Sequence, residues 1–118
     1  MEYVAEITKL LNDYFKAKAE GDVNGMWILI YDPYGTEEED FKKKTQKEVD
    51  DYSKSNYKPS YTLVSIDSVD EKNESGDVRW KGCNFAKITY KQGNWEKKEE
   101  IAVLIKEGQA YLNYCKRI

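Results

Sequence analysis

The stretch that decides the fold is residues 83–115, CNFAKITYKQGNWEKKEEIAVLIKEGQAYLNYC, which contains two short reversals, at Gly93 and at Gly108. From Pro59 onward the pattern changes to a period of two, and each reversal interrupts it. Alternation around a two-residue, glycine-containing break is typical of a β-hairpin with a tight turn. The stretch therefore predicts three antiparallel strands in sequence, with a register that the two turns determine.

The predicted register assigns each side chain to one of two faces, because side chains alternate along a strand. The apolar face, which should lie under the helices, collects Trp80, Ala86, Ile88, Ile101, Val103, Ile105, Leu112 and Tyr114. The opposite, mixed face collects Cys83, Phe85, Lys87, Glu100, Ala102, Leu104, Tyr111 and Asn113. We interpret the mixed face as the interface of a homodimer, since five apolar residues fall together on it. The alternative is an exposed sheet with scattered apolar side chains, which are normal on protein surfaces.

Residues upstream of Pro59 follow the period of a helix. Apolar side chains recur at helical spacing over 2–20, and Gly21 ends this helix. Residues 22–31 predict a second helix, and Thr36 begins a third, peripheral one with a capping box. Strands are expected at 61–69, 78–91, 95–106 and 109–116. The sequence predicts an α+β fold of one domain, residues 1–118: three N-terminal helices packed on one face of a four-stranded antiparallel meander sheet.

Composition excludes several kinds of function. The net charge of −3 and the absence of a clustered basic face argue against nucleic-acid binding. No run of about 18 apolar residues is present, so we expect no membrane span. Histidine is absent and the two cysteines are 32 positions apart, so we expect no metal and no cofactor. One strand lies between the two cysteines in the predicted register, which predicts two free thiols and a cytoplasmic protein. An exported chain stripped of its leader would give the same sequence.

The order of elements and the helix-to-helix stretch YFKAKAEGDVNGMW, residues 14–27, resemble the NTF2-like (cystatin-like) superfamily. The chain is most similar to small bacterial NTF2-like domains of unknown function, some of them lipoproteins. The resemblance implies a curved sheet that wraps the helices and leaves a cavity at its open end. It also implies a dimer through the outer sheet face. Some members of the superfamily are acid/base enzymes with a carboxylate in the cavity.

Candidate site residues follow from this expected cavity. Tyrosines and an inward-facing amide combine apolar area with a polar tip and are the expected ligand-binding residues: Tyr14, Tyr31, Tyr34, Asn84 and Tyr90. No catalytic motif is present, and the two candidates for a base are Asp67 and Asp32. Asp67 faces inward if Ser75-Gly76 is a two-residue turn, whereas one residue of difference turns Val64 and Ile66 inward and leaves Asp67 in solvent.

Three functions remain open from the sequence. The first is a non-catalytic NTF2-like domain, homodimeric, that binds a small apolar ligand or a protein partner. The second is a small isomerase-like or dehydratase-like enzyme that uses a pocket aspartate. The third is an inhibitor or adaptor that acts through the acidic surface of the third helix.

Overall fold

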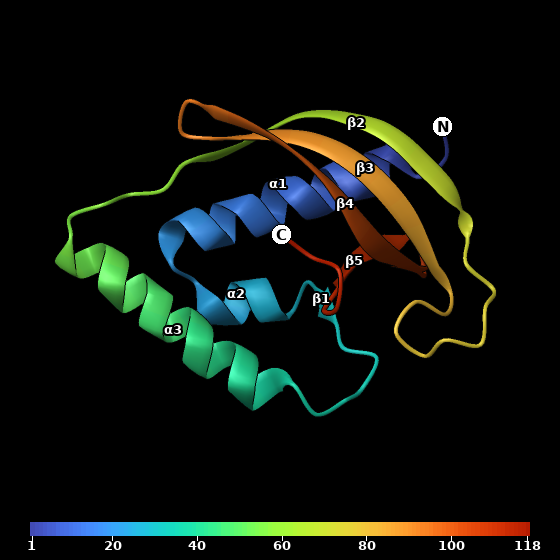
Figure 1. The fold of residues 1–118 in the computed structure, drawn as a ribbon, viewed down its shortest axis with the longest axis horizontal. Helices are drawn as coiled ribbons and strands as arrows, with labels where there is room; N and C mark the ends of the chain where they lie inside the picture. The colour runs from blue at the N-terminus through green and yellow to red at the C-terminus, as the bar shows by residue number, and fades with distance from the viewer.

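The computed structural model describes residues 1–118 as three helices and five strands (Figure 1). Their bounds are α1 (Val4–Glu20), α2 (Val23–Trp27), β1 (Ile30–Tyr31), α3 (Glu38–Lys54), β2 (Tyr61–Lys72), β3 (Cys83–Gln92), β4 (Trp95–Lys106) and β5 (Gln109–Asn113). The sheet has the order β1-β5-β4-β3-β2, and β2 to β5 form an antiparallel meander. The α+β class and the meander agree with the prediction.

The two tight hairpins have the predicted register. Gln92 pairs with Trp95, and Ile105 pairs with Ala110. Gly93 has a φ of 60°, a backbone conformation that glycine adopts without strain, as the first position of a tight hairpin turn requires. The apolar face consequently points toward the helices, where Ile101, Val103 and Leu112 are each fully buried.

The prediction of a four-stranded, fully antiparallel sheet is wrong at one edge. The predicted second helix stops early, and the next residues form β1, which pairs with β5 in parallel. Leu112 N–H donates to the Leu29 carbonyl at 2.8 Å, and Tyr114 N–H donates to the Tyr31 carbonyl at 2.9 Å. The physical reason is that β5 would otherwise leave its outer row of backbone groups unpaired, and the short apolar run 28–31 suits a strand as well as a helix.

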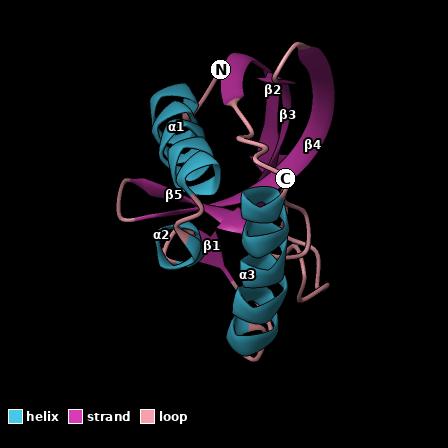
Figure 2. Cartoon of the chain, turned by 90° about the vertical axis from the view of Figure 1, so that its left-hand side faces the viewer, coloured by secondary structure: helices cyan, strands magenta, loops and turns pink.

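Helix α1 provides the main support beneath the curved sheet (Figure 2). Its apolar stripe contains Ile7, Leu11 and Tyr14, all of which are completely buried. Gly21 ends the helix in the left-handed conformation, and the Asp22 carboxylate caps α2 by accepting from Gly25 N–H at 2.9 Å. These two features confirm the predicted junction between the first and second helices.

Helix α3 lies at the periphery, as predicted, and packs chiefly on α2. Phe41 is its one buried side chain. The predicted capping box at Thr36 is wrong, because α3 begins two residues later and its N-cap, Glu37, makes no side-chain cap. The Asp32 carboxylate instead accepts from the Glu37 N–H at 2.9 Å and from the Tyr34 N–H at 3.0 Å, which holds the loop before the helix.

The predicted strand 78–91 begins at Cys83 instead, since residues 78–82 form turns. Trp80, which we expected on the inner face, packs edge-to-face on Phe85 with a centroid distance of 5.9 Å. Phe85 lies on the outer face, opposite Ala102. No helix of the structure has both the length and the apolar character that a membrane crossing needs.

Candidate functional site

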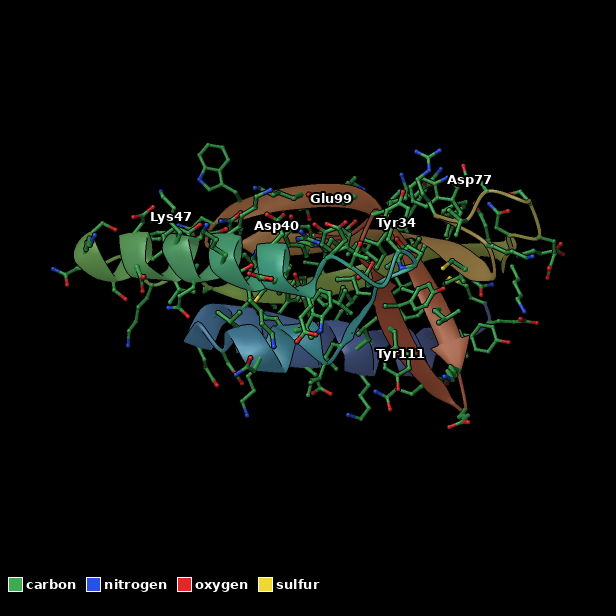
Figure 3. All side chains as sticks on the ribbon, turned by 90° about the horizontal axis from the view of Figure 1, so that it is seen from below. Tyr34, Asp40, Lys47, Asp77, Glu99 and Tyr111 are labelled. Carbon is green, nitrogen blue, oxygen red and sulfur yellow. The ribbon has the colours of Figure 1, made fainter.

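The five predicted ligand-binding residues do not line one cavity. Tyr14 and Tyr90 are buried in the core, whereas Tyr34 is 45% exposed. Figure 3 shows Tyr34 at the same end of the molecule as Asp77, far from Lys47 on α3. Tyr31 belongs to the edge strand β1. Asn84 is buried, and its amide donates to the Asp70 carbonyl across β2 and β3 at 3.0 Å. These residues stabilise different parts of the fold.

Aromatic rings fill the region where α1 meets the concave face of the sheet. Phe15 packs against Tyr61 and Tyr90, with ring centroids 5.7 Å and 5.4 Å away. The Tyr90 hydroxyl donates to the Glu99 carboxylate at 3.0 Å, and burial together with this bond raises the pKa of Tyr90 to about 12. Because its pKa is raised, the Tyr90 phenol stays protonated and acts as a neutral hydrogen-bond donor.

Neither aspartate candidate has the environment of a general base. Asp67 is exposed on the outer face, because Ile66 pairs with Ile88 and points inward. Its carboxylate accepts from the hydroxyls of Ser65 and Thr89, both at 2.6 Å, and these bonds lower the pKa of Asp67. The carboxylate of Asp32 accepts the two backbone N–H bonds described above. Of the two alternatives for this strand, the structure has the one in which Ile66 turns inward and Asp67 lies in solvent. Val64, which that alternative also turns inward, is instead 50% exposed, because the pairing shifts between Leu63 and Ser65.

The mixed face is partly covered by the chain itself. Cys83, Ala102 and Asn113 are completely buried within the protomer. The Asn113 amide donates to the Arg79 carbonyl at 2.7 Å and contacts the Cys83 sulfur at 3.4 Å. The other predicted interface residues, Phe85, Lys87, Glu100, Leu104 and Tyr111, are half-buried or exposed. Both cysteines are free thiols in the structure.

A hollow of about 370 Å³ lies between the C-terminal ends of α1 and α3. Its walls are residues 18–21 at the end of α1, Val49, Tyr52 and Ser53 of α3, and residues 56–59 of the following loop. The rings of Tyr52 and Tyr57 meet edge-to-face at 5.3 Å on one side of it. The walls mix apolar and aromatic side chains with polar ones such as Lys18, Glu20 and Lys58.

Lys18 is a partly buried cation in the wall of this hollow. Its side chain is half-buried, and its ammonium lies over the Tyr61 ring at 5.5 Å. It takes part in none of the ion pairs of the structure. Burial lowers the pKa of Lys18, and the Glu48 carboxylate opposes this shift. A partly desolvated ammonium without a carboxylate partner favours an anion or another acceptor beside it.

Arg117 is a second cation, in the segment that follows β5. Its guanidinium carbon is 5.0 Å from the Phe41 ring centroid and 4.9 Å from that of Tyr114. Its Nε is buried and has no hydrogen-bond partner. The next residue, Ile118, accepts a hydrogen bond from the Tyr14 hydroxyl at 3.1 Å. Residues 114–118 thus lie against α1 and α3, in the space where we expected an open cavity.

Sequence reasoning missed both cations and the hollow. The available signal was that Lys18 continues the α1 stripe of Ile7, Leu11 and Tyr14, where a lysine is out of place. The structure contains no group of three or more acidic, cysteine or histidine side chains that could hold a metal. Comparisons with protein-family models, with curated proteins and with solved structures found no match.

Proposed function

We propose that the chain is a non-catalytic, NTF2-like domain that binds a small apolar ligand in the hollow between α1 and α3. The observation that carries this proposal is the pair of tyrosine rings, Tyr52 and Tyr57, over a hollow of about 370 Å³. Tyr57 is 47% exposed, so part of its ring is free to contact a ligand. An aromatic ligand would stack on these rings and remove apolar area from water.

The test is a titration with 2-naphthol, followed by the amide resonances of the labelled protein. We expect shifts in residues 18–21 and 49–59 and a Kd below about 1 mM, which for about 11 non-hydrogen atoms is about −0.4 kcal/mol per atom. Tyr57→Ala should weaken binding several-fold. Tyr34→Ala is the matched control, since Tyr34 is 45% exposed but lies at the other end of the molecule. No binding at millimolar 2-naphthol, or shifts confined to other residues, would refute the proposal.

A homodimer through the outer face stays part of this proposal. The surface left for a second copy is the area around Phe85, Leu104 and Tyr111, which is half-buried in the single chain. Sedimentation at tens of micromolar tests it, with Leu104→Glu as the variant that should give monomers. A monomeric wild-type protein at these concentrations would remove the dimer from the proposal and leave the ligand site unaffected.

A further inference from the structure

The most exposed large apolar side chain of the molecule stands at the tip of the β3–β4 hairpin. Trp95 is 75% exposed, more than any other large hydrophobic residue. Figure 1 shows this tip at the same end of the molecule as the chain that enters β2, and the two are joined: Gly93 N–H donates to the Ser60 carbonyl at 2.9 Å, and Gln92 pairs with Tyr61. An indole this exposed adds little to the core, so its apolar area is available to a partner.

Four exposed lysines surround this indole. Lys97 lies on the same face of β4 as Trp95, and Lys98 lies on the opposite face, because side chains alternate along a strand. Lys91 of β3 also lies on the opposite face, and Lys58 lies in the loop that leads to Ser60. Positive charge therefore flanks the tip on both faces of the hairpin.

This charge is not neutralised within the chain. The two segments that meet here, residues 55–60 and 91–98, contain these four lysines and one acidic residue, Glu96, so their net charge is +3, whereas the whole chain carries −3. None of the five charged residues takes part in an ion pair. The Lys97 amine donates to the Gln92 side-chain oxygen at 2.8 Å, which holds it at the tip. The tip is a basic region on an acidic protein, and it complements an anionic partner.

We propose that the hairpin tip docks on an anionic lipid bilayer, with the Trp95 indole in the interfacial region and the lysines against the headgroups. A planar surface that lies across the tip meets the lysines of both faces, whereas a protein groove that holds one face would leave those of the other face unused. Tryptophan is enriched at the membrane–water interface, where its ring is in an apolar layer and its N–H stays hydrated. Docking of this kind needs no membrane-spanning helix and does not depend on the proposed ligand site.

The experiment measures binding to vesicles of phosphatidylcholine that contain about 30% phosphatidylserine, by co-sedimentation and by tryptophan emission. Trp95 is the one exposed tryptophan of the three, so the emission should shift to shorter wavelength when the indole leaves water. Trp95→Ser should abolish this shift and weaken binding at least about tenfold. Each lysine near an anionic surface contributes about fivefold, so Lys97→Gln combined with Lys98→Gln should weaken binding about 25-fold.

Two matched controls separate the tip from the rest of the surface. Ile28→Ser removes a side chain that is 71% exposed at the end of α2, and it should bind as the wild-type protein does. Lys43→Gln combined with Lys44→Gln on α3 makes the same change in net charge and should also leave binding unaffected.

Three outcomes would overturn the proposal. The first is no binding at millimolar anionic lipid, and the second is equal binding to vesicles of pure phosphatidylcholine. The third is binding that Trp95→Ser does not weaken, because another surface would then be responsible. Binding of soluble polyglutamate without binding of vesicles would also overturn it, and would assign the tip to an acidic protein partner.

Discussion

Replacing Phe41 by alanine should detach α3 from the rest of the molecule. Phe41 is 2% exposed and is the only buried residue of that 17-residue helix. Its ring lies 5.2 Å from the Trp27 ring and 6.5 Å from the Tyr114 ring, and Arg117 lies over it. Truncating a buried phenylalanine costs about 3–5 kcal/mol, and the partial exposure of the neighbouring rings favours the lower end, about 3 kcal/mol. At about 4 °C per kcal/mol, the melting temperature should fall by about 12 °C.

The assay is urea unfolding followed by circular dichroism, together with amide hydrogen exchange over residues 38–54. If α3 detaches before the rest unfolds, its amides should lose protection while those of α1 keep theirs. Tyr52→Ala on the same helix is the control, and it should cost about 1 kcal/mol because Tyr52 is only half-buried. A loss below about 1 kcal/mol for Phe41→Ala would refute the reasoning, since another contact would then hold the helix.

Three other measurements test the packing. Asn113→Ala should lower the free energy of unfolding by about 2 kcal/mol in urea, because it removes two part-buried hydrogen bonds: the one that its amide donates to the Arg79 carbonyl and the one that it accepts from the Cys115 N–H. A change within about 0.5 kcal/mol, the size of an ordinary surface substitution, would contradict these bonds. In a thiol titration, Cys115 should react in the folded protein, whereas Cys83, whose pKa burial raises, should react only on unfolding; equal rates would contradict its burial. Hydrogen bonds lower the pKa of Asp67 below 3.8, so its stabilisation is present above pH 3.8 and is lost as the pH falls through the folded-state pKa. Asp67→Asn should therefore show a shallower acid loss of stability than the wild-type protein, and parallel curves would count against this assignment.

The sequence predicts correctly those parts of the fold that a few neighbouring residues specify. The register of β3, β4 and β5 follows from two turns of two residues each, and a slip by one residue would have turned Ile101 and Val103 to the solvent. The end of α1 follows from Gly21 for the same kind of reason, because a left-handed residue is needed there. In each case a few neighbouring residues specify the geometry.

The predictions that were wrong or left open concern elements held by contacts between residues distant in sequence. β1 consists of two residues, and only its pairing with β5 makes it a strand rather than a helical turn. The register of β2 could not be counted from its turn, because three irregularities shift its pairing with β3 between Leu63 and Lys72. One of those shifts lies next to Asp67 and contributes to the arrangement in which Ile66 points inward and Asp67 outward. A period-two pattern carries no information about a bulge.

The position of the hollow could not be predicted either, because it also depends on contacts between residues distant in sequence. The residues of the predicted cavity were chosen on the assumption that the space between the helices and the concave sheet is open. In the structure residues 114–118 occupy part of it, because the strand predicted over 109–116 already ends at Asn113. By lying against α1 and α3, it places Arg117 over the rings of Phe41 and Tyr114 and the Ile118 carbonyl beside the Tyr14 hydroxyl. The segment that fills the expected cavity therefore also joins α3 to α1, and the hollow that remains lies at the C-terminal ends of these two helices.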